Sequence, residues 1–208
     1  MRQRNPLILV PAVLLMGVIA CKKEPTSPTP RPAFHEDLNG TALNSGIWVV
    51  QPGDGEIVVA NGVATLCSSG AAFPVATTRD NPFPAGDFLV RVRMRYLSIA
   101  PCGSGFGAVD NFSSGCKPFE IWQDAGGWYI YSGSDARLLG PPPQTDYHVY
   151  EWRYWSQYGQ YDSSVDGVGV ISGVCAPRAT KIFFGHPAPT GCGNWTSFEI
   201  DYIHIEPL

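Results

Sequence analysis

The stretch that decides the predicted fold is K-P-F-E-I-W-Q-D-A-G-G-W-Y-I-Y-S-G, from Lys117 to Gly133. Apolar and polar residues alternate along its first arm with the period of two that is typical of a β-strand. A glycine-rich turn, Ala125-Gly126-Gly127, follows, and residues 128–131 run back as a second arm. One side of the first arm is therefore predicted to carry a carboxylate, an indole and a second carboxylate, namely Glu120, Trp122 and Asp124.

The composition favours an all-β domain with many short strands. The chain of 208 residues contains 23 glycines and 19 prolines, with 12% aromatic and only 15% charged residues. Frequent turns and few charges are typical of such domains. The net charge is −4, and no cluster of basic residues extends beyond Lys22-Lys23, which argues against nucleic acid as a partner.

Other segments repeat the strand pattern, whereas no segment shows the periodicity of an amphipathic helix. Two further hairpins are predicted around Asn61-Gly62 and Asp166-Gly167, because these dipeptides favour tight turns. A bulge is expected near Asp201-Tyr202, where the apolar phase of the last strand slips. About ten strands joined by frequent turns predict a β-sandwich or a β-barrel. The expected strands outside the hairpins are 88–97, 106–109, 147–155, 181–186 and 197–205.

The first 20 residues are predicted to be a bacterial lipoprotein signal peptide. A basic start precedes an apolar run, Leu7–Ala20, that is short for a transmembrane helix. The run ends in Val18-Ile19-Ala20-Cys21, which resembles the lipobox, the motif in which the cysteine is lipidated and the preceding peptide removed. An ordinary secretory signal and a short membrane anchor are the alternatives.

The proline-rich residues 21–33 are predicted to form an extended tether between the lipid and a folded domain at 34–208. The domain is then expected in the bacterial cell envelope, anchored to a membrane through Cys21 and facing the periplasm or the exterior.

Export permits disulfides between the remaining cysteines. Cys102 with Cys116 and Cys175 with Cys192 each enclose a short loop, so these two pairs are the predicted disulfides, and Cys67 is left as a free thiol. The connectivity does not follow from the sequence alone. A zinc site is the competing interpretation, although no two of these cysteines have the C-x₂₋₄-C spacing of such sites.

Several segments resemble the concanavalin A-like jelly-roll superfamily, which includes laminin G-like domains, legume lectins and family 16 glycoside hydrolases. Residues 34–48, F-H-E-D-L-N-G-T-A-L-N-S-G-I-W, are similar to its F-x-D-D-F-x-G-T-x-L-x-x-x-W opening. The resemblance covers residues 34–208 in the expected order and implies an all-β, two-sheet antiparallel jelly-roll sandwich, a fold that serves many functions. The motifs G-D-F-x-V-x-V, W-H-x-Y-x-I, Y-V-D-G and F-x-I-D-Y-I-R-V are similar to residues 86–92, 147–152, 163–167 and 198–205.

In the family 16 enzymes the catalytic strand reads E-x-D-x-E or E-x-D-x-x-E, and its outer carboxylates act as nucleophile and general acid/base. The corresponding residues here are Glu120, Trp122 and Asp124. A tryptophan replaces the central aspartate, and the shorter aspartate replaces the last glutamate. The resemblance therefore leaves a divergent glycoside hydrolase using Glu120 and Asp124 as an alternative and favours a non-catalytic domain.

The same row suits carbohydrate, because aromatic faces stack on pyranose rings and carboxylates accept hydrogen bonds from hydroxyl groups. Depending on the phase of the second arm, either Tyr129 and Tyr131 or Trp128 would extend the stacking surface. Trp155 and Trp195 are further candidates, although a tryptophan in a sandwich is more often part of the core.

Two charged features remain. The stripe formed by Arg91, Arg93 and Arg95 could bind an anionic glycan, but an exposed sheet face is the preferred interpretation. The resemblance also implies a structural calcium ion between the acidic opening segment and the closing strand, with Asp37 (or Glu36) and Asp201 as ligands. No other cofactor is predicted.

We therefore predict an exported, lipid-anchored domain that binds a poly- or oligosaccharide without catalysis of its own. The divergent glycoside hydrolase is one alternative. A structural or adhesion module of the cell envelope, which contacts protein rather than sugar, is the other.

Overall fold

In the computed structural model, every regular element is a β-strand. The structure describes residues 34–68, 74–98, 104–110, 118–124, 126–141, 145–185 and 196–208. These ranges contain fifteen strands and no helix, so none of the described residues belongs to a helix that could span a membrane. The predicted signal peptide, Cys21 and the tether lie outside the described residues.

The first sheet has eight strands in the spatial order β13-β12-β11-β6-β15-β4-β3, with β1 also paired to β15. Its longest strands, β6 and β15, lie at the centre and pair with each other along most of their length. The strands are β1 (Phe34–Glu36), β3 (Gly55–Ala60), β4 (Val63–Ser68), β6 (Phe88–Ser98), β11 (His148–Trp155), β12 (Gln160–Val165), β13 (Val168–Cys175) and β15 (Thr196–Pro207).

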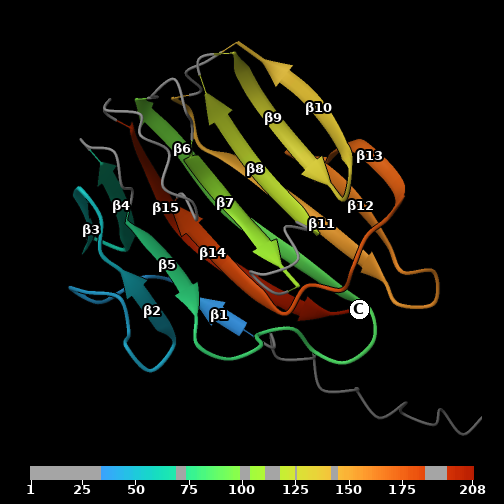
Figure 1. Ribbon diagram of the computed structural model, residues 1–208, viewed down its shortest axis with the longest axis horizontal. Coiled ribbons are helices and arrows are strands. Elements are labelled where there is room, and N and C mark those ends of the chain that lie inside the picture. Colours follow the sequence, from blue (N-terminus) through green and yellow to red (C-terminus); the bar gives the residue numbers. More distant parts are fainter. Residues whose placement is uncertain are drawn as a thin grey trace, which may run out of the picture.

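The second sheet has seven strands in the order β10-β9-β8-β7-β14-β5-β2. All pairs in both sheets are antiparallel, so the predicted two-sheet antiparallel sandwich is confirmed. Figure 1 shows β8 and β9 side by side, far from β2 at the other edge of this sheet. The strands are β2 (Trp48–Gln51), β5 (Val75–Thr78), β7 (Ser104–Val109), β8 (Phe119–Asp124), β9 (Gly127–Ser132), β10 (Asp135–Gly140) and β14 (Lys181–Gly185).

The three predicted hairpins are present. Asn61 and Gly62 have φ values of 54° and 78°, and Asp166 and Gly167 have values of 50° and 77°. Two successive positive φ angles match the twist of the flanking strands, which is why Asn-Gly and Asp-Gly were strong signals. The predicted bulge in the closing strand is confirmed by a register shift between Ile200 and Tyr202.

Four strands were not predicted. β1, β2 and β5 are only three or four residues long, too short for alternation to stand out. β10 is exposed along most of its length and shows no clear apolar period. Long-range pairing with neighbouring strands, rather than local sequence, makes these segments strands.

One face of each sheet packs against the other sheet to form the main core. The side chain of Trp152, on β11, is fully buried in this core and stacks on Phe119 of β8 with ring centroids 4.7 Å apart. Its indole Nε1 donates a hydrogen bond of 3.1 Å to the backbone oxygen of Tyr131 on β9. Trp152 therefore joins the eight-stranded sheet to the two strands that carry the opening hairpin.

Replacement of Trp152 by alanine is expected to destabilise the domain by about 3–5 kcal/mol, because it leaves a large cavity and removes the hydrogen bond to Tyr131. Urea denaturation measures the free energy of unfolding. The control is Tyr158→Ala in the β11–β12 turn, where the side chain is 62% exposed. That change is expected to cost less than about 0.5 kcal/mol, and equal losses in the two variants would contradict the assignment of Trp152 to the core.

Candidate functional site

The hairpin of β8 and β9 presents one row of side chains on the outer face of the seven-stranded sheet. On β8, Phe119, Ile121 and Gln123 face the core and are fully buried, so the alternate residues face outward. Direct cross-strand partners lie on the same face of a sheet. We call the outward set the aromatic platform: Glu120 opposite Tyr131, Trp122 opposite Tyr129, and Asp124 at the turn.

The structure shows which aromatic residues of β9, the second arm of the hairpin, face outward. Tyr129 and Tyr131 lie on the outer face, half-buried, with ring centroids 6.2 Å apart. Trp128 points the other way, is 7% exposed and packs against His148 and Tyr150 in the core. The structure therefore rules out the option that placed Trp128 on the stacking surface.

Two glycines of the neighbouring strand lie beside the platform. Gly105 and Gly107 of β7 are the direct partners of Trp122 and Glu120. A Cβ on Gly105 would lie 1.8 Å from the backbone oxygen of Ile121, and one on Gly107 would lie 3.1 Å from the ring of Phe183. No side chain fits at either position, so neither residue can place one beside the platform.

The carboxylate of Asp124 holds the β8–β9 turn. Its Oδ1 accepts hydrogen bonds from the backbone N–H groups of Gly126 and Gly127, at 2.7 and 3.1 Å. Its Oδ2 accepts one from the Trp122 indole Nε1 at 3.3 Å. This bond holds the indole of Trp122 by its Nε1 edge.

The end of the platform farther from the β8–β9 turn, at Glu120, is less accessible to solvent than the end at the turn. Glu120 is 4% exposed, whereas Trp122 and Asp124 are half-buried. Burial raises the pKa of the Tyr131 phenol, and the negative charges of Glu120 and Asp124 add to this effect. Tyr131 is therefore a neutral phenol around pH 7, able both to donate and to accept a hydrogen bond.

The other tryptophan candidates do not join the platform. Trp155 lies at the end of β11 in the eight-stranded sheet, where its Nε1 donates to Asp162 at 2.6 Å. Trp195 lies outside the described residues.

The arginine stripe on β6 is neutralised by carboxylates of its own sheet. The guanidinium of Arg91 contacts Glu151 at 2.7 Å and Glu206 at 2.9 Å. The two other arginines, Arg93 and Arg95, pair with Asp201 and Glu199. The outer face of this sheet is thus a ladder of ion pairs, in agreement with the preferred interpretation of the stripe.

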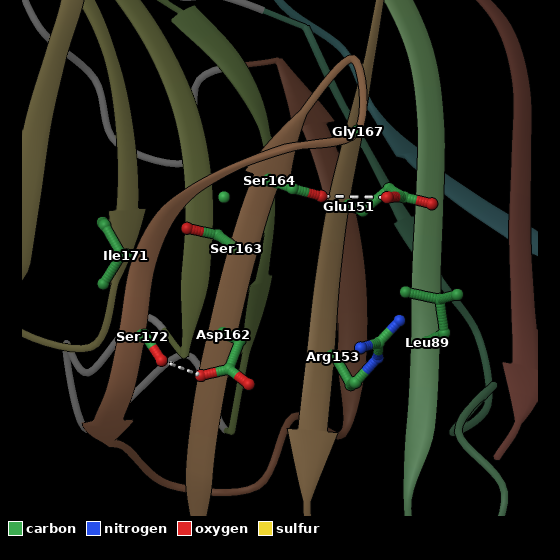
Figure 2. Close-up of a pocket in the computed structure, with 10 residues that line it drawn as sticks. Leu89, Glu151, Arg153, Asp162, Ser163, Ser164, Gly167, Ile171 and Ser172 are labelled. Atoms are coloured by element: carbon green, nitrogen blue, oxygen red, sulfur yellow. Dashed lines mark hydrogen bonds between the residues drawn. The ribbon is translucent and has the colours of Figure 1, made fainter.

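A groove that the sequence did not predict lies on the eight-stranded sheet (Figure 2). It has a volume of about 310 Å³, at the lower end of small-molecule sites. The pairing register of β12 and β13 shifts around Ser163, beside this groove. In the sequence, the pair Ser163-Ser164 followed by glycines at 167, 169 and 173 was the signal that could have indicated an irregular sheet here. The lining residues are Leu89, Glu151, Arg153, Asp162, Ser163, Ser164, Gly167, Gly169, Ile171 and Ser172.

Two carboxylates in the groove are held by hydrogen bonds, as Figure 2 shows. Burial acts to raise the pKa of Asp162, but hydrogen bonds from Trp155, Gly173 and Ser172 outweigh it and lower the pKa below its usual 3.8. The pKa of Glu151 is lowered in the same way, by Arg91 and Ser164 against burial. Both groups are therefore charged at neutral pH.

The predicted calcium ligands have other partners. The Asp201 carboxylate is paired with the guanidinium of Arg93. Asp37 Oδ1 is hydrogen-bonded to His35 and His204, at 2.7 and 3.0 Å. Calcium prefers a set of six to eight oxygen ligands, so the partners of these two aspartates do not fit a calcium site.

The cysteines differ from the prediction in one respect. Cys175 is an exposed free thiol, so the predicted Cys175–Cys192 disulfide is not formed in this structure. Cys67 is a free thiol as expected, and burial, followed by the charges of Glu56 and Glu199, raises its pKa. The predicted Cys102–Cys116 pair, like Cys192, lies outside the described residues.

Solved structures with the same architecture include a prokaryotic β-1,3-1,4-glucanase (lichenase) derived from a mouse hindgut metagenome. The TM-score is 0.60 and the sequence identity 18%, over 84% of this chain and 99% of that chain. A structure from work on endo-acting O-glycanases of the human gut microbiota, which initiate mucin breakdown, gives a TM-score of 0.64 and 13% identity. It covers 86% of this chain and 100% of that one.

A third similar structure is the CBM2 module of the evolved Dit protein of Lactobacillus casei BL23 phage J-1. Its TM-score is 0.56 at 16% identity, over 84% of this chain and 94% of that chain. The sequence matches no family model and no curated protein. These similarities, together with the two antiparallel sheets, show that the chain has the concanavalin A-like jelly-roll fold.

The lowered pKa of Asp162 predicts a pH-dependent contribution to stability. A carboxyl group whose folded pKa lies below its unfolded value stabilises the fold above the unfolded value, and this contribution is lost as the pH falls through the folded pKa. Asp162→Asn is therefore expected to lower the melting temperature at pH 7, and the difference from wild type is expected to shrink as the pH falls below the usual aspartate pKa of 3.8. Thermal unfolding followed by circular dichroism between pH 2 and 7 measures both.

The matched control is Asp135→Asn, at an exposed position at the start of β10. A difference between Asp162→Asn and wild type that stays constant across the pH range would show that the variant disturbs packing rather than charge.

Proposed function

We propose that the domain binds a neutral poly- or oligosaccharide on the aromatic platform and does not catalyse its hydrolysis. The observation that carries this proposal is the register of β8 and β9, which places Trp122 directly opposite Tyr129 on the outer face, with Tyr131 as the next residue of β9 on that face. Three aromatic rings from two adjacent strands thus share one surface.

The chemistry of the platform fits a sugar. Aromatic rings offer large apolar faces with few rotatable bonds, which suits stacking on the C–H faces of pyranose rings. The Trp122 indole is held by its edge through Asp124. The phenols of Tyr129 and Tyr131 supply hydrogen-bonding groups next to these faces. The face of the indole and the polar groups around it are the combination found in ligand sites with few, well-placed polar contacts.

The contacts of Asp124 favour binding over hydrolysis. In the resembled enzymes the residue at this end of the strand transfers a proton to or from the glycosidic oxygen. Here both carboxylate oxygens of Asp124 accept hydrogen bonds from the turn and from Trp122. Trp122 stands where those enzymes have an acidic residue, so an indole lies between the two carboxylates that would have to act together.

The similar structures include a glycan-cleaving enzyme and a module named CBM2. The lichenase is a β-1,3-1,4-glucanase, and the phage module is a CBM2 module. The lichenase and the structure from the work on mucin O-glycanases point to two first ligands to test, a β-1,3-1,4-glucan and mucin O-glycans.

Trp122→Ala is expected to weaken binding to the recognised glycan by about tenfold or more, because roughly 1.5 kcal/mol from stacking and buried area is lost. Trp122→Phe keeps an aromatic face and is expected to retain most of the affinity. A glycan array identifies the ligand, and isothermal titration calorimetry measures the dissociation constants.

Tyr158→Ala serves as the control for loss of an exposed aromatic residue remote from the platform. Loss of affinity in Asp162→Ala but not in Trp122→Ala would move the site to the groove of Figure 2. Absence of glycan binding at high protein concentration would favour the adhesion module. Release of reducing ends that disappears in Glu120→Gln would show that the domain is a hydrolase.

We further propose that Cys21 carries a lipid that anchors the domain to a membrane of the bacterial cell envelope. The support is the sequence alone: a basic start, the apolar run Leu7–Ala20 and the lipobox-like Val18-Ile19-Ala20-Cys21, followed by a proline-rich tether.

Cys21→Ser is expected to abolish incorporation of labelled palmitate in a bacterial host and to leave the precursor uncleaved, because the thiol is the acceptor of the lipid. Cys67→Ser removes a thiol of the folded domain and is expected to keep the label. Equal labelling of Cys21→Ser and wild type would rule out this anchor.

A further inference from the structure

Three side chains from opposite ends of the described chain converge on one point at the edge of the eight-stranded sheet. Nε2 of His35 and Nε2 of His204 both lie against the same oxygen, Oδ1 of Asp37, at 2.7 and 3.0 Å. The three ligand atoms all lie within 4.8 Å of one another. Two imidazole nitrogens thus meet at one carboxylate oxygen.

The pairing of β1 with β15 creates this arrangement. His35 is the direct cross-strand partner of His204, so both rings lie on the same side of the sheet. The neighbours Ile203 and Ile205 are fully buried in the core, which directs His204 to the outer face. The two histidine rings are 3.8 Å apart between centroids.

The backbone after β1 aims Asp37 at the two rings. The carboxylate of Glu36 accepts hydrogen bonds from the backbone N–H of Leu38 and from Nε1 of Trp48, both at 3.1 Å. Leu38 adopts a positive φ of 55°, which reverses the chain while its side chain is buried. Asp37 is held between these two anchored residues, so its carboxylate position is set by the fold.

We propose that His35, Asp37 and His204 form a binding site for a transition-metal dication, with Zn²⁺ as the ion that fits best. Nitrogen ligands from histidine and one carboxylate oxygen suit zinc, whereas calcium requires oxygen ligands throughout. Ligand atoms about 2.0–2.1 Å from a tetrahedral ion lie about 3.3 Å apart. The two Nε2–Oδ1 separations of 2.7 and 3.0 Å would therefore widen by about 0.6 and 0.3 Å, and the separation of the two Nε2 atoms, which is at most 4.8 Å, would adjust to the same value.

The surroundings support the ligands. The ring of Tyr202 stacks on His204 with centroids 4.5 Å apart, which restricts rotation of that imidazole. Arg91 is the cross-strand neighbour of His204 on the other side, but its positive charge is paired with Glu151 and Glu206. An ion here would therefore not face an uncompensated guanidinium.

Metal binding would join β1 to β15 through side chains as well as backbone. β1 has only three residues and pairs with a single strand. Three protein ligands leave one tetrahedral position for water or an external ligand, which is the arrangement of an accessible zinc site. The half-exposed side chains of His35 and Asp37, at 44% and 47%, make the site open to ions from solution.

The test is titration of the full chain, freed of metal by a chelator, with Zn²⁺ and separately with Ca²⁺ by isothermal titration calorimetry. We expect Zn²⁺ to bind and to raise the melting temperature, and Ca²⁺ to have no effect at the same concentration. His35→Ala and His204→Ala are each expected to weaken Zn²⁺ binding at this site by about tenfold or more, because each removes a ligand.

The control is His148→Gln, which removes another histidine hydrogen-bonded to an aspartate, at 2.7 Å from Asp166, but with no second histidine in the pair. It is expected to retain the Zn²⁺ site. Cys175→Ser tests the exposed thiol and is expected to retain the site as well.

A second measurement does not depend on how the variants fold. In the wild-type protein, NMR of the histidine side chains is expected to show Zn²⁺-induced shifts at His35 and His204 and none at His148. Zn²⁺ binding that persists unchanged in His35→Ala and His204→Ala, or shifts confined to other residues, would overturn the proposal. Preferential binding of Ca²⁺ would do the same.

Discussion

The stacking of Trp152 on Phe119 is the contact on which the site depends. Phe119 begins β8, and a strand has a period of two, so burying Phe119 against Trp152 turns Glu120, Trp122 and Asp124 outward. The same indole donates to the backbone oxygen of Tyr131 and thereby holds β9 against the core. A single side chain of the eight-stranded sheet thus sets which face of the opening hairpin meets the solvent.

Much of this hairpin was predictable because its signals are local. Alternation along the first arm and the glycines of the turn are both contained in a few consecutive residues, and the structure has the strands where they were expected. The phase of the second arm was not predictable in the same way. Trp128, Tyr129 and Tyr131 are all aromatic, so composition does not distinguish the core side from the outer side, and only the pairing of Asp124 with Gly127 decides it.

The features that were missed come from contacts between distant segments. Asp37 and His204 are 167 positions apart and meet only because β1 pairs with the last strand. The sequence predicted Asp37 beside Asp201, an acidic residue of that strand. In the structure Asp201 lies in the bulge, and its carboxylate pairs with Arg93 instead. The groove likewise depends on a register shift between β12 and β13, and such shifts leave only a weak trace in a single sequence.

Trp122 stands where the resembled glycoside hydrolases have an aspartate, and this difference has a physical consequence beyond the absence of a charge. An indole Nε1 can only donate a hydrogen bond, and here it donates to Asp124. Trp122 and Asp124 therefore form a linked pair, whereas an active site of this type would need two carboxylates that act independently. With one donor on Oδ2 and two on Oδ1, three of the roughly four acceptor positions of the Asp124 carboxylate are occupied. The bond to Asp124, which is itself held by the turn, restricts rotation of the Trp122 ring. A rigid aromatic face loses less entropy when a sugar stacks on it. The substitution therefore weakens the case for catalysis and strengthens the case for binding by one and the same interaction.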